Sequence, residues 1–193
     1  MGRSVYRAYP RSKDLLVVFM KTKIKDAYVI EHEKRYDERG FFIRTWCKKE
    51  FEAQGLVSQF VQFNTSFSKK KGMLRGLHYQ VSPHQEAKLI RCVKGAIFDV
   101  MIDLRKKSPT YMQWDGLELR ADTYKMVYIP EGVAHGFQTL EDETEIFYPV
   151  SDLYSPDLER GIRWNDPAFN IKWPEVPNRV LSEKDKNWSD YLA

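Results

Sequence analysis

Apolar and polar residues alternate along most of the middle of this chain, with the period of two that indicates β-strands. In the run KLIRCVKGAIFDVMIDL (88–104), two short alternating stretches meet at Lys94-Gly95, which predicts a β-hairpin. Similar runs follow over 111–140 and over 143–149, where the pattern stops at Pro149. Short strands at this spacing, with turn residues between them, predict a sandwich or a barrel.

Helical periodicity is confined to two segments. The stretch IRTWCKKEFEAQGL (43–56) has apolar residues at helical spacing and a glycine near its end, which predicts one helix. The stretch SEKDKNWSDYL (182–192) predicts a second, short helix with Ser182 as its N-cap. We therefore expect an all-β protein, a β-barrel or jelly roll with a few short peripheral helices.

A length of 193 residues suits one all-β domain with a sizeable core. The most apolar stretch, LLVVFM (15–20), is far shorter than the roughly 20 residues of a membrane-spanning helix, so no membrane association is expected. Because Met20-Lys21 is a plausible natural start, we expect residues 1–20 to form an N-terminal extension. Residues 21–193 are then a single domain.

The charge balance of 31 basic and 27 acidic residues, net +4, does not favour nucleic-acid binding but leaves room for a local anion site. The chain has two cysteines, Cys47 and Cys92, and no recognisable signal peptide. A disulfide is therefore not expected, and a reducing cytoplasm is the predicted location.

The four histidines fall into two classes. His32 lies in a strongly charged stretch and His84 in a Ser-Pro-His loop, so both are expected near solvent. His78 and His135 are embedded in apolar sequence beside glycines, and the segment PEGVAHGF (130–137) is similar to the second motif of the cupin barrel. A metal site built from His78, His84, Glu86 and His135 is an alternative, but the paired histidines of metal-binding cupins are missing. No metal is predicted.

Without a metal, His78 in a strand, with a lysine ten residues on, suits general acid–base chemistry. Lys88 could supply a fixed positive charge to a developing oxyanion, or it could be an ordinary lysine at a strand edge. Asp99 could contribute to the site, or it could be a buried aspartate paired with Lys88 or Arg91 for structural reasons.

Several motifs in one order carry a more specific signal: RGLHYQ (75–80), EAKLIRCVKGAIFDVMIDLRKKSPTY (86–111), IPEGVAHGF (129–137), FYPVSDLYSPDLERGIRWNDP (147–167) and LSEKDK (181–186). Together, over about residues 21–190, they resemble the dTDP-4-dehydrorhamnose 3,5-epimerase family. The resemblance implies a cupin-type barrel enzyme that inverts C3, C5 or both in a nucleotide-linked 4-keto-6-deoxyhexose. It implies no metal and no other cofactor, because the ketone of the substrate accepts the electrons.

The same resemblance assigns roles to five residues. His78 is the expected base, and Asp185 is the carboxylate that orients its imidazole. Tyr148 is the expected acid on the opposite face of the sugar. Lys88 is expected to hold the C4 oxygen and stabilise the enolate, and Asp99 is expected to keep Lys88 in place.

Other matching positions imply a nucleotide site. Arg39 and Arg75 match diphosphate ligands, and Tyr154 matches the aromatic residue that stacks on the base. The remaining expected substrate contacts are Gln62, Asn64, His135, Glu159 and Lys184, together with Arg44, which stands where the family usually has a glutamate. The family implies a homodimer with exchanged N-terminal strands, in which Arg39 serves the neighbouring subunit.

Several alternatives stay open at this point. Arg44, and Phe63 in place of the usual aspartate, lie on the nucleotide side of the expected site. A CDP or other nucleotide therefore stays open beside dTDP, the family default. Inversion at C3 alone, at C5 alone or at both also stays open. A related keto-sugar isomerase would keep the fold and change the outcome. Two hypotheses from other functional classes are a metal-dependent cupin oxygenase and a catalytically inactive sugar-nucleotide binder.

Overall fold

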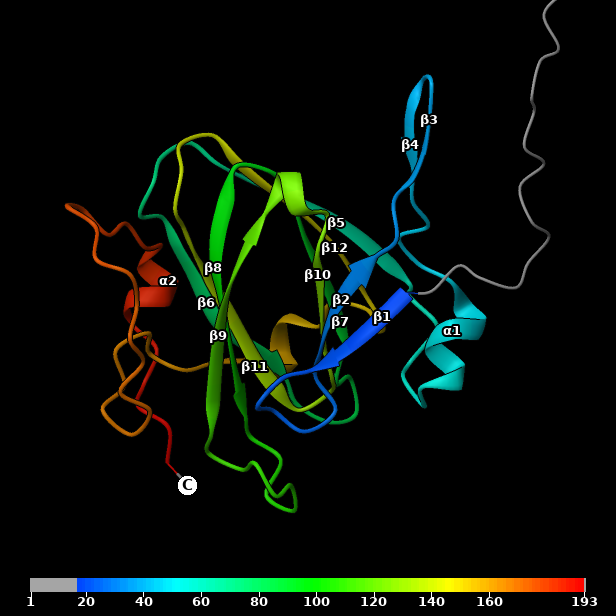
Figure 1. Cartoon of the computed structure of the whole chain (residues 1–193). Coiled ribbons are helices and arrows are strands. Elements are labelled where there is room, and N and C mark those ends of the chain that lie inside the picture. The colour runs from blue at the N-terminus through cyan, green and yellow to red at the C-terminus, as the bar shows by residue number, and fades with distance from the viewer. Residues whose placement is uncertain (1–16, 193) are drawn as a thin grey trace, which may run out of the picture.

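Two antiparallel sheets pack face to face in this protein (Figure 1), whose computed structural model describes residues 17–192. The six-stranded sheet has the order β1 (Val17–Lys21), β2 (Tyr28–His32), β10 (Met126–Ile129), β7 (Lys88–Lys94), β12 (Thr144–Val150) and β5 (Gln62–Ser68). The five-stranded sheet has the order β13 (Glu159–Gly161), β6 (Leu74–Gln80), β11 (Val133–Thr139), β8 (Ala96–Asp103) and β9 (Trp114–Arg120). This is a jelly-roll barrel of the cupin type, as the sequence predicts.

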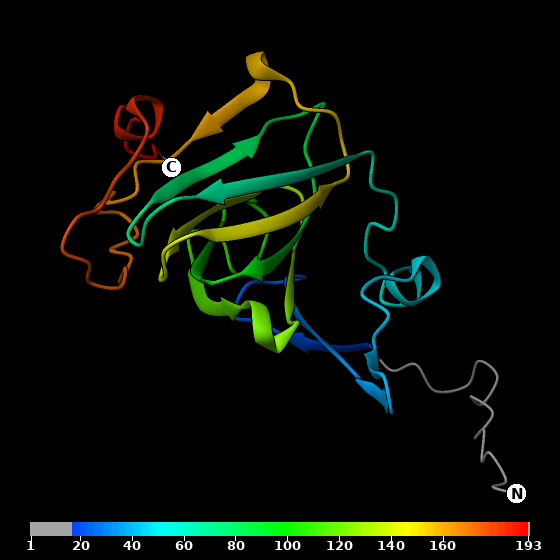
Figure 2. The same cartoon turned by 90° about the horizontal axis from the view of Figure 1, so that it is seen from above.

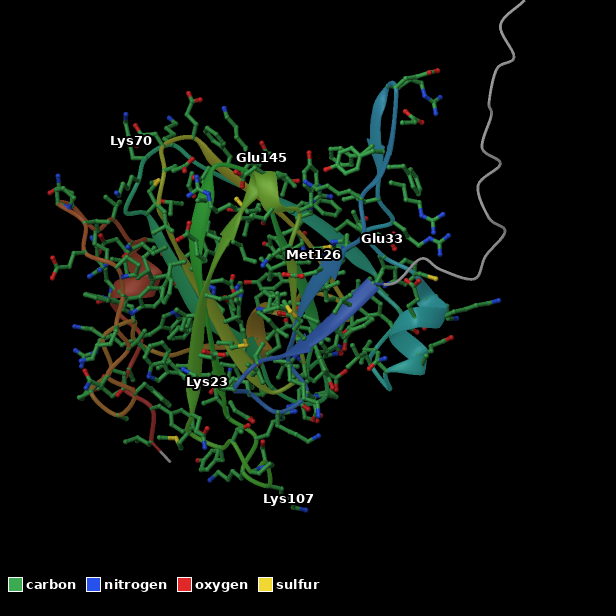
Figure 3. The ribbon with its side chains drawn as sticks, viewed as in Figure 1. Lys23, Glu33, Lys70, Lys107, Met126 and Glu145 are labelled. Atoms are coloured by element: carbon green, nitrogen blue, oxygen red, sulfur yellow. The ribbon has the colours of Figure 1, made fainter. Side chains whose placement is uncertain are left out.

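The main core lies between the two sheets. Alternate residues of each strand point inward, as the period of two requires. From the six-stranded sheet come Ile90, Cys92, Val127 and Ile146, and from the five-stranded sheet Ile97, Met101, Leu119 and Val133. Met126, on the other face of β10, belongs to a separate cluster, while Lys70 and Lys107 mark opposite ends of the barrel (Figure 3).

Two further clusters close the outer faces. Residues 162–181 cover the five-stranded sheet, where Ile162, Phe169 and Trp173 pack against Leu77 and Val100. On the other side, α1 (Lys48–Ala53) packs Phe51 against strands β2, β7 and β10. Helices α1 and α2 (Glu183–Lys186) therefore lie on opposite sides of the barrel (Figure 2).

The hairpin predicted at Lys94-Gly95 is wrong. Strand β7 pairs with β10 and β12, whereas β8 pairs with β9 and β11, so the turn at Gly95 carries the chain from one sheet to the other. Four of the seven β7 residues and six of the eight β8 residues are apolar, and a tight turn between such strands has the same sequence signature whether it joins strands of one sheet or of two. The distinction depends on long-range pairing.

Both predicted helices are present but shorter than the patterns suggest. In the first segment, Cys47 is extended and Trp46 packs its ring on Phe51 and Phe60, so the helix starts only at Lys48. In the second, the Ser182 side chain accepts a hydrogen bond from the Asp185 N–H, which confirms the predicted N-cap. Two 3₁₀ turns, η1 (Ala121–Thr123) and η2 (Pro156–Leu158), complete the helical content of the described residues.

Near the N-terminus, residues 17–20 belong to strand β1, which pairs with β2 across its whole length. The expected boundary after residue 20 therefore falls inside a strand, and residues 1–16 lie outside the described part of the chain. Strands β3 (Arg35–Asp37) and β4 (Gly40–Phe42) form a hairpin that projects away from the barrel (Figure 1). Within residues 17–192, no helix is long and apolar enough to cross a membrane.

Candidate active site

Two adjoining cavities of about 260 Å³ and about 320 Å³ open between the sheets and share the side chains of His78, Lys88 and Tyr148. The first is also lined by Ser66, Arg75, His135, Lys184 and Asp185. The second is also lined by Gln62, Asn64, Glu86, Tyr154 and Glu159. All but three of the residues predicted for the site (Arg39, Arg44 and Asp99) line one of these cavities.

His78 on β6 is held by Asp185 of α2, with 2.5 Å between His78 Nε2 and Asp185 Oδ1. The Asp185 side chain is only 6% exposed. Burial alone would raise the pKa of this carboxyl, but the hydrogen bonds from His78 and from the Gly76 N–H lower it below its usual value. The carboxylate is thus ionised and accepts the Nε2 proton, so that His78 Nδ1 carries the lone pair a general base needs.

The backbone brings a second histidine next to the first. His135 on β11 is the direct partner of His78 on β6. Beside this pair the strands approach so closely that a Cβ on Gly76 would lie 2.7 Å from both Gly136 Cα and the His135 carbonyl oxygen. The glycines next to the two histidines therefore allow the close approach of the strands that carry them.

Asp99 and Lys88 are not partners, so the expectation that Asp99 keeps Lys88 in place is wrong. Asp99 is fully buried on β8 and bonds to His135, with 2.7 Å between Oδ2 and Nε2. Lys88 Nζ lies 3.1 Å from Glu86 Oε1 and donates to the His78 carbonyl oxygen at 3.4 Å. Each side chain therefore has its own partner, His135 for Asp99 and Glu86 for Lys88.

Tyr148 on β12 reaches the cavity from the six-stranded sheet, opposite the sheet that carries His78. Burial, followed by the nearby Glu86 carboxylate, raises the pKa of the Tyr148 phenol above its usual value. The phenol is therefore protonated at neutral pH and can act as a proton donor.

At the far end of the site, Glu159 is hydrogen-bonded to two other predicted residues, Tyr154 and Lys184. Its Oε2 accepts hydrogen bonds from the Tyr154 hydroxyl at 2.6 Å and from Lys184 Nζ. Gln62 Oε1 accepts a hydrogen bond from the Tyr154 backbone N–H at 2.7 Å. These contacts hold Tyr154, whose ring is largely exposed, at the rim of the cavity.

Three predicted arginines have different places. Arg75 on β6 lines the cavity and donates to the Phe67 carbonyl oxygen at 3.1 Å. Arg39 lies in the projecting hairpin, beside Asp37, and Arg44 Nη1 lies 3.8 Å from Glu50 Oε1. Within the described residues of one chain, neither Arg39 nor Arg44 lines the two cavities.

The alternative ligand set for a metal does not assemble. His84 is in a loop, as expected, 3.2 Å from Asp152 Oδ2, and Glu86 pairs with Lys88. His78 and His135 each pair with a separate aspartate. In the described part of the chain, no group of three or more His, Cys, Asp or Glu side chains is arranged to hold a metal ion.

The prediction that His32 is solvated is wrong. Its ring is partly buried, with Nδ1 3.0 Å from the Tyr124 carbonyl oxygen and Nε2 3.2 Å from that of Thr45. Burial lowers the pKa of this imidazole. The charged residues around it in sequence lie on the other face of the strand or beyond its end, which the sequence stretch alone does not reveal.

Sequence reasoning considered Glu86 only as a ligand of the alternative metal site and gave Trp188 no role. Glu86 and Lys88 are two residues apart at the start of a strand, a spacing that places both on one face, so their pairing had a visible signal. Trp188 follows α2 and its ring contacts His78 edge to face. Its position depends on how the C-terminal segment folds back, and the local sequence pattern does not predict this contact.

The two packed sheets define a cupin-type jelly-roll barrel, and the His–carboxylate pairs and buried tyrosine inside it are the groups of a general acid–base enzyme. The chain belongs to the dTDP-4-dehydrorhamnose 3,5-epimerase family, whose model matches residues 21–192. A relative from Shigella flexneri, described as dTDP-4-dehydrorhamnose 3,5-epimerase, is 48% identical over 90% of this chain and 95% of its own.

Solved structures give the same result. A Bacillus anthracis dTDP-4-dehydrorhamnose 3,5-epimerase with TDP and PPi bound has a TM-score of 0.86 and 41% identity, covering 91% of this chain and 100% of its own. A Legionella pneumophila dTDP-6-deoxy-D-glucose-3,5-epimerase in complex with dTDP-4-keto-L-rhamnose has a TM-score of 0.82 and 39% identity, covering 88% and 90%.

Proposed function

We propose that this chain epimerises a dTDP-linked 4-keto-6-deoxyhexose at C3 and C5. One observation carries the proposal: the His78–Asp185 pair and Tyr148 reach one cavity from opposite sheets, with Lys88 beside them. A base and an acid on opposite sides of a sugar are what inversion at a carbon requires.

In this mechanism the proton next to the ketone moves to His78 Nδ1, and the electrons of the broken C–H bond form a C=C bond. The former carbonyl electrons then reside on the C4 oxygen as an enolate, which the Lys88 ammonium stabilises. Collapse of the enolate draws the phenolic proton of Tyr148 to the same carbon from the other face. The imidazolium and the phenolate then exchange protons with solvent, which restores both groups.

The same site offers contacts for a nucleoside diphosphate. Arg75 is available for the diphosphate, since a guanidinium suits bidentate contact with phosphate oxygens. The exposed ring of Tyr154 suits stacking on the base. The two thiols, Cys47 and Cys92, are unpaired, which suits the reducing cytoplasm in which we place the protein.

Calorimetric titration with dTDP and CDP, followed by turnover of the two 4-keto-6-deoxyglucose conjugates, tests this proposal. We expect dTDP to bind more tightly and its keto sugar to be converted. Preference for CDP would correct the nucleotide while leaving the reaction, and conversion at one carbon only would reduce the claim to a single-site epimerase. Failure to convert either sugar would contradict the proposal.

The active form is proposed to be a dimer in which Arg39 of one subunit serves the site of the other. The projecting hairpin exposes Tyr36 and Phe42 at 72% and 56%, and strand β5 exposes Phe63 at 65%, a concentration of aromatic surface typical of an interface. Mixing Arg39→Ala with His78→Asn subunits tests this. Exchange should restore about a quarter of wild-type activity, because half of the dimers then contain one intact site. A mixture as inactive as its components would contradict the sharing.

A further inference from the structure

Trp188 lies against the imidazole of His78 from outside the cavity. The ring centroids are 6.2 Å apart and the planes meet at 67°, an edge-to-face contact. Lys184 Nζ lies 5.6 Å from the centroid of the same indole. Trp188 thus contacts both the expected base and one of the residues that hold Glu159.

The space that Trp188 occupies exists because residue 161 is a glycine. Gly161 on β13 is the direct strand partner of His78. A Cβ at this position would lie 2.1, 2.2 and 2.3 Å from three atoms of the Trp188 ring, closer than any real contact. The indole therefore packs flat on the backbone where a side chain would otherwise stand, next to His78.

The indole N–H does not anchor this ring by hydrogen bonding. Trp188 Nε1 is buried and has no hydrogen-bond partner among the described residues. A buried donor without a partner costs free energy, on the order of 1–3 kcal/mol. The indole is therefore held here by its packing against Gly161 and His78 and not by a hydrogen bond.

We propose that Trp188, seated on Gly161, is a positioning residue for His78 in the epimerisation proposed above. The hydrogen bond to Asp185 fixes one ring nitrogen but leaves the imidazole free to swing about that contact. The edge-to-face contact removes this freedom and shields the pair from water. Asp185 lies in α2 and Trp188 follows three residues later, so one short segment supplies both the carboxylate that bonds to His78 and the indole that packs against it.

Steady-state kinetics of Trp188→Leu and Trp188→Phe test the proposal. A displaced general base lowers the rate of proton abstraction and leaves nucleotide binding intact. We expect Trp188→Leu to lower kcat by about 10- to 100-fold with KM changed by less than about threefold, and Trp188→Phe to recover most of the loss. Trp164→Leu is the matched control, because Trp164 also carries a stacked cation, Arg179, but lies away from the cavities.

A double-mutant cycle with Gly161 separates positioning from general destabilisation. Gly161→Ala should lower kcat in the wild-type background and have little further effect in Trp188→Ala, since the three nearest atoms that the new Cβ would meet all belong to Trp188. An equal effect in both backgrounds would contradict the claim that Gly161 provides the space in which Trp188 packs. Wild-type kcat in Trp188→Leu, or a loss matched by Trp164→Leu, would overturn the proposal. Absence of turnover in the wild-type protein would instead overturn the proposed function.

Discussion

His78 and Tyr148 line the same cavity from different sheets, His78 from β6 and Tyr148 from β12. Neither strand pairs with the other, so the distance between base and acid is set by the packing of the two sheets. A sugar ring between the sheets would present one face to each group. The architecture of the barrel thus supplies the two-sided arrangement that inversion needs.

Asp185→Asn should lower kcat by about 100-fold, because an amide neither carries the charge that stabilises the imidazolium nor fixes the tautomer of His78. The control is Glu183→Gln in the same helix, whose side chain is 82% exposed and pairs with Lys186. Initial rates under saturating substrate measure the effect. Equal activity of the two variants would mean that Asp185 has only a structural role.

Tyr148→Phe should impair proton return more than proton removal. Exchange of the sugar protons with solvent should then persist while epimerisation falls by about 10²-fold or more. Because burial raises the pKa of the wild-type phenol, the midpoint of any alkaline loss of activity caused by Tyr148 should lie above the ordinary pKa of a tyrosine. Mass spectrometry for exchange and NMR for product measure the two processes separately, and equal losses in both would contradict the assigned acid.

Arg75→Ala should weaken substrate binding and raise KM by about tenfold or more, with a smaller effect on kcat, because its expected partner is the diphosphate rather than the reacting carbon. Arg120→Ala, which removes an exposed arginine paired with Glu118 and Glu141, is the control. Calorimetric titration with dTDP gives an independent value of affinity. An unchanged KM and affinity would place the phosphate site elsewhere.

Asp103 anchors the end of β8 and should give the fold a measurable acid sensitivity. Burial alone would raise the pKa of Asp103, but hydrogen bonds from Arg105, Ser108 and Thr110 lower it from 3.8 to about 2. Because the folded-state pKa is depressed, the stabilisation is complete above about pH 4 and is lost as the pH falls through about 2.

This shift corresponds to about 2 kcal/mol. Asp103→Asn should therefore lower the free energy of unfolding by about that amount at pH 7 and by little near pH 2. Urea unfolding at both pH values measures it, with the exposed Asp122→Asn as control. A constant difference across this range would mean that the charge of Asp103 is not what stabilises the fold.

The contents of the cavity were largely predictable from the sequence, whereas the contacts within it were not. His78 and Lys88 stand out because polar side chains interrupt alternating apolar strands, whereas Tyr148 was indicated by the family resemblance. The fold places all three in one cavity. Their partners depend on which strands pair. A hairpin of β7 and β8 would bring Asp99 toward Arg91 and Lys88, but the strands lie in different sheets and Asp99 meets His135 instead.

Long-range packing accounts for the other differences too. Trp188 reaches His78 only because the C-terminal segment folds back over a glycine of β13, more than twenty residues earlier in the chain. His32 is enclosed by carbonyl groups from Tyr124 and Thr45, which its charged neighbours in sequence do not indicate. Local periodicity predicts which residues face inward, but the partner of each depends on the order of strands.

Proton NMR of dTDP-4-keto-6-deoxyglucose in D₂O, with the wild-type protein and with His78→Asn, tests the central claim most directly. The wild-type protein should introduce deuterium at C3 and C5 and form the inverted product, and His78→Asn should do neither while still binding dTDP. Exchange and inversion at the wild-type rate in His78→Asn would contradict the assignment of His78 as the base.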